Sequence, residues 1–404
     1  MKQSSLINRK MIILIAALCL LTAALIVMIV ISSRESKPGS NTKISIAEQF
    51  PDPALQWLVS ENVDIDGDGY LSKEEIACVK QLHIDRSFSI FRINKPYTDD
   101  DVLFINGKPE NDPSDKKMEA ILTCRCVDGI EVFTELEELT VTSVDYQWAL
   151  DLRSMSKLRK LTCTDNSSLK ELKLGDLSQM EELNLSFNSL PELRIGKANK
   201  LKTLACTGNY MTNFTIEEAE QLTELRCSSN KLQQLQVGHL KNLEILSCYD
   251  NQLAELDVDD LTGLKELVCH DNVLFQLNVE NLTELEQLKC ADNRISELKI
   301  GNLTKLQDLD VDDNRISELE IGEKPQLYYV KCNRNCLTKL DFSGCPNLYT
   351  LFFEGNEVSE LNISNNPSMY TLYGRSNRLL DVMISPGVIP SDNNYEFDDW
   401  VVVH

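Results

Sequence analysis

The chain has 404 residues, of which 42% are hydrophobic, so it holds enough apolar material for a large core. Its 40 basic and 63 acidic side chains give a formal net charge of −23 at pH 7. A surface this acidic repels phosphate groups, which argues against nucleic acid and anionic lipid surfaces as partners, whereas cations and basic proteins remain compatible.

The N-terminal part contains a segment that is predicted to cross a membrane. Residues 11–31 carry no charged side chain, and at about 1.5 Å per residue a helix of this length reaches roughly 30 Å, which is enough to span a bilayer. Lys2, Arg9 and Lys10 precede it. The positive-inside rule therefore places residues 1–10 in the cytoplasm and the rest of the chain outside the cell. Cleavage as a signal peptide, followed by secretion, is the alternative.

A polar linker, residues 32–45, leads to a predicted calcium module at residues 46–82. Within it the segment DIDGDGYLSKEE matches the 12-residue EF-hand loop. The ligand positions of this loop are filled by Asp64, Asp66, Asp68, Tyr70, Ser72 and Glu75. The short carboxylates each offer single oxygens, the tyrosine offers its backbone carbonyl, and the glutamate offers two oxygens. Because these carboxylates would repel one another around an empty centre, the sequence predicts a bound Ca²⁺; a solvated acidic turn is the alternative.

The calcium site is expected to be structural. EF-hand loops usually occur in pairs, and the sequence contains no second loop. A single site in an extracellular medium would stay filled, so we expect the ion to tie two short helices into a plug at the start of the following domain. Residues 83–120 show no period and are predicted to be a capping insertion.

From residue 121 to residue 384 the chain repeats a pattern, L-x-x-L-x-C-x-x-N, every 21 or 22 residues. A fixed period in this range indicates a solenoid. Its twelve cysteine positions are occupied by Val141, Cys163, Leu185, Cys206, Cys227, Cys248, Cys269, Cys290, Val311, Cys332, Phe353 and Gly374. Each coil is predicted to contribute one short strand to a parallel β-sheet on the concave face, with extended or 3₁₀ segments on the opposite wall. Residues 385–404 are expected to form a C-terminal cap.

Two columns of residues are expected to hold the coils together. Asparagines recur from Asn166 to Asn377 and are predicted to satisfy backbone groups in neighbouring coils. The recurring cysteines share their position with leucine and valine, so we expect them to pack as small hydrophobic residues rather than form disulfides or bind zinc. A bridge between Cys336 and Cys345 remains open.

The residues that flank each strand are expected to face outward on the concave side. There the sequence places a set of carboxylates and rings: Asp308, Asp310, Asp312, Tyr329, Phe352 and Tyr373. Rings at outward positions are hard to explain by core packing, and aromatic side chains often anchor protein interfaces. The alternative is that the rings shield the last coils. A second column of aspartates (Asp250, Asp271, Asp292 and Asp313) precedes the asparagines. These side chains either belong to the binding surface or only keep it solvated.

Over residues 46–384 the chain resembles bacterial surface leucine-rich repeat (LRR) proteins, broadly internalin-like, in which an EF-hand-like plug precedes cysteine-containing repeats. The resemblance implies surface display and the binding of a protein partner, without naming a ligand. The chain departs from many such proteins in its predicted N-terminal membrane helix, which we expect to take the place of the wall-attachment signal that they carry.

No motif of a known enzyme class appears, and His270 beside Asp271 is expected to be a surface residue. The sequence therefore predicts a binding protein rather than an enzyme. Two functions remain: a membrane-tethered module that binds a protein on another surface, or a scaffold that binds a partner protein on the same cell.

Overall fold

The computed structural model describes residues 43–86, 90–93, 124–144, 147–379, 381–382, 394–399 and 401–403. The predicted membrane segment 11–31 lies outside these residues, as does most of the predicted insertion 83–120. Within the described residues, no helix has the length and apolar character needed to cross a bilayer. Residues 44–404 form one compact unit.

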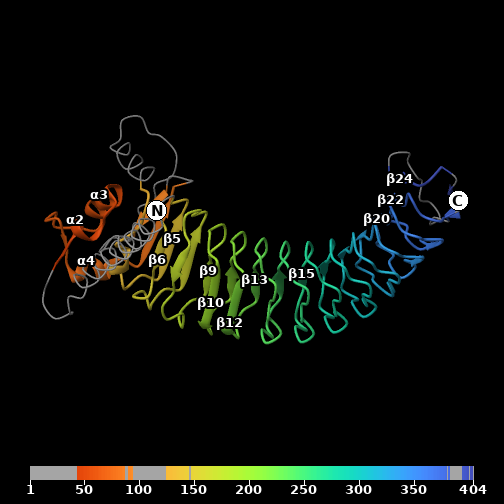
Figure 1. The fold of residues 1–404 in the computed structure, drawn as a ribbon, viewed down its shortest axis with the longest axis horizontal. Helices are drawn as coiled ribbons and strands as arrows, with labels where there is room; N and C mark the ends of the chain where they lie inside the picture. Colours follow the sequence, from red (N-terminus) through yellow and green to blue (C-terminus); the bar gives the residue numbers. More distant parts are fainter. Residues whose placement is uncertain are drawn as a thin grey trace, which may run out of the picture. The chain divides into compact units, whose positions relative to one another are not determined.

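The repeats stack into one sheet of fifteen strands within the described part of the chain (Figure 1). These strands are β3 (Gln81–Asp85), β4 (Ile90–Ile93), β5 (Glu138–Thr142), β7 (Lys160–Thr164), β9 (Glu182–Asn184), β11 (Thr203–Ala205), β13 (Glu224–Arg226), β14 (Ile245–Ser247), β15 (Glu266–Val268), β16 (Gln287–Lys289), β17 (Asp308–Asp310), β18 (Tyr329–Lys331), β20 (Thr350–Phe352), β22 (Thr371–Tyr373) and β24 (Tyr395–Glu396). All neighbours pair in parallel except β3 and β4. Equivalent residues face each other, as Leu246 faces Leu267. The predicted solenoid of about twelve coils is confirmed.

The alternation of side chains within each strand explains the sheet. In β13, Leu225 points into the core, while Glu224 and Arg226 are half-exposed on the other side. Cys227 follows and is also fully buried. We call the outward side of the fifteen-stranded sheet the sheet face. All partner-binding residues expected from the sequence belong to coils whose strands form this face.

The cysteine column is part of the core, as predicted. Its seven cysteines, Cys163, Cys206, Cys227, Cys248, Cys269, Cys290 and Cys332, are buried and free. Burial raises the pKa of the Cys227 thiol to about 12, so it is a neutral, weakly polar group that packs like an aliphatic side chain. Cys336 is exposed and Cys345 is buried, and both are free thiols, so the bridge left open by the sequence does not form.

The asparagine column joins consecutive coils, as predicted. The Nδ2 atom of Asn272 donates to the carbonyl oxygen of Cys248, one coil earlier, and to that of Cys269 in its own coil, both at 3.1 Å. Its Oδ1 atom accepts from the backbone amide of Leu253 at 2.9 Å. The asparagine thus satisfies backbone groups that the turn leaves without a strand partner.

The wall opposite the sheet is extended in part. Parallel pairs in the described repeats include β6 (Ala149–Asp151) with β8 (Glu171–Lys173), β10 (Glu192–Lys197) with β12 (Asn213–Glu218), and β19 (Lys339–Asp341) with β21 (Glu360–Asn362). The 3₁₀ segment η1 (Ile130–Val132) precedes the first repeat strand, β5. In the coils between β12 and β19 the wall has turns closed by i→i+3 hydrogen bonds, such as that from the amide of Leu264 to the carbonyl of Leu261. The described repeats therefore use both predicted alternatives, extended pairs and 3₁₀-type turns.

Both ends of the sheet carry added elements. At the N-terminal end, β1 (Ile44–Ser45), α2 (Ile46–Gln49), α3 (Pro53–Asn62), β2 (Tyr70–Leu71) and α4 (Lys73–Cys78) lead directly into β3. The sheet therefore starts well before residue 121, the predicted start of the solenoid, and the antiparallel strand β4 closes it. At the other end, β24 extends the sheet, and β25 (Val402–Val403) pairs with β23 (Asp381–Val382).

Candidate functional site: the acidic loop and the sheet face

The acidic loop lies between α3 and α4. Gly67 and Gly69 have φ angles of 69° and 81°, a left-handed backbone that glycine adopts without strain, and these turns fold the loop back on itself. Ser72 then caps α4, because its side chain accepts a hydrogen bond from the backbone amide of Glu75. The turn and the cap together fix where the acidic side chains point.

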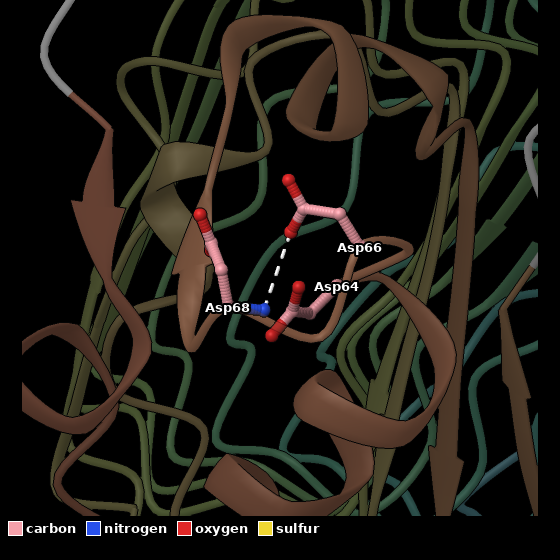
Figure 2. Close-up of side chains that lie close together, drawn as sticks. All are labelled: Asp64, Asp66 and Asp68. Carbon is pink, nitrogen blue, oxygen red and sulfur yellow. Dashed lines mark hydrogen bonds between the residues drawn. The ribbon is translucent and has the colours of Figure 1, made fainter.

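Asp64, Asp66 and Asp68 converge in this loop (Figure 2). Each offers a carboxylate oxygen, and these oxygens lie within 4.8 Å of one another. Asp64 accepts hydrogen bonds from the backbone amides of Gly67, at 2.9 Å, and Gly69, at 2.8 Å. The backbone amide of Asp68 donates to Asp66 at 3.2 Å. The aspartates predicted as ligands are therefore brought together.

Glu75, predicted to supply two ligand oxygens, is hydrogen-bonded to the protein through both of them. One carboxylate oxygen accepts from the backbone amide of Ile65 at 2.7 Å, and the other accepts from the amide and the hydroxyl of Ser72. Burial alone would raise the pKa of Glu75, but these hydrogen bonds together lower it. The carboxylate is therefore held as an anion at the edge of the loop.

The strand within the loop has a partner from outside it. β2 pairs antiparallel with β1, so that Tyr70 faces Ser45 and Leu71 faces Ile44. Leu71 is buried in the core. The segment that enters the folded unit is thus paired with the middle of the acidic loop.

The chemistry of this loop fits a hard divalent cation. The converging atoms are all carboxylate oxygens, the type of ligand that Ca²⁺ prefers. The carbonyl of Tyr70 and the side chain of Ser72 lie in the same loop and complete the predicted set of oxygen donors. Glu75 is the one predicted carboxylate ligand that the three-aspartate group does not include.

The three rings expected on the sheet face form a continuous row. The ring centroids of Tyr329 and Phe352 lie 6.2 Å apart in an edge-to-face arrangement, and those of Phe352 and Tyr373 lie 5.2 Å apart and are stacked. All three side chains are half-exposed. Their interaction spans the coils of β18, β20 and β22 and fixes the ring orientations.

A second row of rings was not predicted. Tyr328, Tyr349 and Tyr370 occupy one equivalent position in the same three coils and are 47%, 45% and 52% exposed. The rings of Tyr349 and Tyr370 are stacked with centroids 5.1 Å apart. Their recurrence at intervals of 21 residues was visible in the sequence. We call the six rings of both rows the aromatic surface.

Carboxylates border the aromatic surface on its N-terminal side. Asp308 and Asp310 point outward on either side of the buried Leu309 in β17, and Asp308 lies directly opposite Tyr329 in the sheet. Burial, and the negative charge of Asp312, raise the pKa of Asp310. Burial also raises the pKa of Asp312, although hydrogen bonds from Asn333 oppose this effect.

Basic side chains of the protein partly compensate these carboxylates. Lys289 lies 3.3 Å from an oxygen of Asp308, and Lys331 lies 3.9 Å from an oxygen of Asp310. Asp312 instead accepts hydrogen bonds from the backbone amide and side-chain amide of Asn333. The border of the aromatic surface is therefore polar and paired rather than a bare cluster of negative charge.

The column of aspartates before the asparagines has a conformational explanation. Asp250, Asp271, Asp292 and Asp313 have φ angles of 53°, 54°, 50° and 51°, all in the left-handed region. Aspartate tolerates this region better than most residues because its short polar side chain bonds locally. The backbone of the turn is thus enough to account for the recurrence of aspartate in this column.

Comparison with known proteins identifies the architecture. No protein-family model matches the chain, and no curated protein matches it. Among solved structures, the functional domain of InlJ from Listeria monocytogenes, described as including a cysteine ladder, is 24% identical with a TM-score of 0.58, over 89% of this chain and 82% of that one. An internalin, InlF, from the same organism is 18% identical with a TM-score of 0.55, over 89% and 98%.

At these identities the likeness establishes the fold. Both matches extend over most of this chain and have TM-scores above 0.5. The chain therefore has the leucine-rich repeat solenoid fold found in these internalins.

Proposed function

We propose that the protein is a membrane-anchored, extracellular LRR protein that binds a protein partner through its sheet face. The aromatic surface carries this proposal. Its rings occupy outward positions where core packing does not need them, and three tyrosines are about half exposed. Clustered exposed rings bordered by polar groups are typical of protein interfaces, in which aromatic side chains supply anchoring contacts.

The charge of the chain favours a protein ligand over a nucleic acid. A net charge of −23 disfavours phosphate backbones, and the border of the aromatic surface is formed by carboxylates. The internalin-like fold supports the proposal at the level of architecture, because each coil displays its outward strand residues side by side on one face.

The test is a triple substitution of Tyr329, Phe352 and Tyr373 by serine. Labelled wild-type and variant proteins are incubated with intact target cells, and bound protein is measured over a concentration series. We expect the variant to lose at least tenfold in affinity while keeping the wild-type melting temperature. Tyr210→Ser is the matched control, because Tyr210 is 57% exposed and lies outside the aromatic surface. Undiminished binding of the triple variant would contradict the proposal.

Membrane attachment is the second part of the proposal. It is supported by the uncharged segment 11–31 and the basic residues before it. Protease treatment of intact cells tests it, because digestion of residues after the segment, with protection of an epitope in residues 1–10, is the expected result. Release of the whole chain into the medium would favour secretion after cleavage instead.

A structural calcium site is the third part. We propose that Asp64, Asp66 and Asp68, with the Tyr70 carbonyl, Ser72 and Glu75, would hold Ca²⁺, whose charge offsets the repulsion of the loop carboxylates. Calorimetric titration with Ca²⁺ tests this role, with melting temperature as a second readout. Asp64→Asn is expected to weaken binding and to abolish the stabilisation by Ca²⁺, whereas Asp259→Asn on the exposed outer wall leaves both unchanged. No heat of binding to the wild type would refute the site.

The alternative is an envelope scaffold whose ligand is another protein of the same cell. The two functions differ in their partners, so crosslinking on intact cells separates them. A scaffold recovers partners from its own cell in the absence of any target surface. A binding module for another surface recovers its partner only when that surface is added.

A further inference from the structure

A hollow lies in the sheet face, in the coils of β7 to β14, far along the sheet from the aromatic surface. Its volume is about 440 Å³, in the range typical of ligand sites. The residues that matter for its chemistry are Ser186, Phe187, Ala205, Arg226, Ser247 and Tyr249. None of them belongs to the aromatic surface or to the aspartates beside it.

Phe187 is strained and exposed at once. Its φ angle is 58°, at the position that most other coils fill with aspartate, serine or glycine and that one coil fills with Arg334. A bulky side chain is rare in this left-handed conformation, which costs free energy that the surrounding fold must offset. The side chain is nevertheless 56% exposed, so the core gains little from it. Core packing therefore does not account for the strain.

The next coil makes room for this ring. Gly208 occupies the same position one coil later, and a Cβ atom added there would lie 2.6 Å from Cδ1 of Phe187. The absence of a side chain at Gly208 thus allows the ring to lie against the backbone. This close approach holds the ring in place beside the hollow.

Arg226 lies in the same hollow, and only part of its guanidinium group is hydrogen-bonded. Its Nε atom donates to Glu224 at 2.5 Å, and within the described chain its two terminal nitrogens form no hydrogen bond or ion pair. Arg334, by contrast, uses both Nε and a terminal nitrogen to bind Asp313. The Arg226 side chain is 40% exposed, and the terminal nitrogens form a fork whose geometry matches a carboxylate.

The neighbours of Arg226 leave space above the strand. In the sheet it lies between Ala205 and Ser247, whose side chains are short. Tyr249 lies at the far side of the hollow, and its ring is stacked on that of His270 with centroids 4.6 Å apart. The hollow thus has short side chains on either side of Arg226 in the sheet, the Tyr249 ring in the coil of β14 at one end, and Thr164 and Asp165 in the coil of β7 at the other. The Phe187 ring, in the coil of β9, lies between these ends.

We propose that this hollow receives a glutamate or aspartate side chain of a protein partner, with the Arg226 fork binding its carboxylate and the Phe187 ring packing against the same segment. Arg226 is the one cation among the lining residues, and the one lining acid, Asp165, follows β7, three strands away in the sheet, so the guanidinium favours a negative group beside it. The acidic chain repels strongly negative partners, which favours a single carboxylate on an otherwise neutral or basic segment. The exposed ring of Phe187 favours a peptide segment over a small free acid, because only the segment is large enough to bind Arg226 and also pack against the ring.

This proposal does not rest on the aromatic surface, and its test uses defined peptides. The full-length protein is titrated against fluorescein-labelled Gly-Phe-Glu-Phe-Gly-amide and the same peptide with glutamine in place of glutamate, and fluorescence anisotropy is measured. We expect the glutamate peptide to bind at least tenfold more tightly. Arg226→Gln should abolish this difference, and Arg226→Lys, which keeps the charge but lacks the fork, should remove most of it.

Phe187→Asn provides a second test, in which peptide binding and thermal stability are expected to change in opposite directions. Asparagine tolerates the left-handed backbone, so we expect the thermal unfolding midpoint to rise while both peptides bind more weakly. Phe275→Asn is the matched control: Phe275 is 52% exposed, its φ is not positive, and it lies outside the hollow, so the substitution should change neither binding nor strain.

Four results would overturn the proposal. They are equal affinities for the two peptides, unchanged preference in Arg226→Gln, unchanged peptide binding in Phe187→Asn, and full displacement of the peptide by free glutarate at equal concentration, which would point to a small-acid site. A Tyr349→Ser and Tyr370→Ser double variant should bind the peptides as the wild type does, which keeps this test separate from that of the aromatic surface.

Discussion

The Nζ atom of Lys324 lies 2.6 Å from the carbonyl oxygen of Ile321, in the wall opposite the sheet. It also donates to the carbonyl of Ile300, one coil earlier, at 2.8 Å. In the preceding coil the equivalent residue is Leu303, whose backbone amide bonds to Ile300, whereas the amide of Lys324 bonds to Gly344 in the next coil. The buried ammonium therefore replaces a backbone donor that this turn has lost.

Lys324→Leu, which restores the residue found in four preceding coils, is expected to destabilise the protein. It leaves the Ile321 carbonyl without the donor it has now, at a cost of about 1–3 kcal/mol. Urea unfolding at pH 7 measures this change. Leu303→Met, a change of similar volume at the equivalent position, is the control and should cost less than about 1.5 kcal/mol. A variant as stable as the wild type would show that the buried amine is dispensable.

The stability contributed by Lys324 is expected to depend on pH. Burial lowers the pKa of its amine to about 8, from an ordinary value of 10.5. Between these pH values the unfolded chain holds a proton that the folded chain has released, so the folded state gains stability as pH rises through this window. The difference in unfolding free energy between wild type and Lys324→Leu should therefore widen from pH 7 to pH 10, and a constant difference would contradict this assignment.

Asn272→Leu is expected to destabilise the solenoid by at least about 3 kcal/mol, because it removes the partners of several buried backbone groups at once. Among them are the amide of Leu253 and the carbonyl of Cys248. Equilibrium unfolding in urea measures the loss. Asn242→Ala is the control, since the Asn242 side chain is exposed and bonds one carbonyl, and it should cost less than about 1 kcal/mol.

Leu225→Asp is expected to unfold the central coils. Leu225 is fully buried, and a carboxylate at this position would have no basic partner. Burying the carboxyl group there, charged or protonated, would destabilise the folded state by several kcal/mol. Circular dichroism during heating measures the effect. Thr223→Asp, on a half-exposed position of the same coil, is expected to melt close to the wild type. An unchanged melting curve for Leu225→Asp would be incompatible with the observed core.

Thiol labelling is expected to follow burial. Iodoacetamide at pH 8 should modify the exposed Cys336 within minutes, while Cys227 and Cys248 react only when the chain unfolds, because burial both covers their thiols and raises their pKa. Mass spectrometry of tryptic peptides measures each site. Rapid labelling of Cys248 in the folded protein would place the cysteine column outside the core.

The sequence predicted well whatever recurs in every coil. The strands, the cysteine column and the asparagine column follow from period alone, because equivalent residues occupy equivalent places. The recurrence of aspartate before each asparagine is also apparent in the sequence. Its cause is not, because the sequence does not show that these residues adopt a left-handed backbone conformation. The row of Tyr328, Tyr349 and Tyr370 is harder to predict, because these residues stand just before the strands rather than beside the strand leucine.

The features that do not recur from coil to coil depend on individual contacts. The ring of Phe187 against Gly208, the unused fork of Arg226 and the carbonyl partners of Lys324 each require three-dimensional neighbours from other coils. In the acidic loop, spacing predicted the convergence of Asp64 with its two neighbours. It did not predict that Glu75 bonds Ser72 and Ile65, because local hydrogen bonds compete with the ligand role.

The equal register of neighbouring coils has a consequence for evolution and for engineering. Excising residues 252–272 would join Asn251 to Val273 and remove one row without altering any remaining row. Arg226 and Tyr329 would then stand one strand spacing, about 4.8 Å, closer together. A rigid partner that contacts both residues would no longer fit the shorter distance between them, whereas a flexible partner would still bind. The number of repeats therefore sets which partners can span the sheet face.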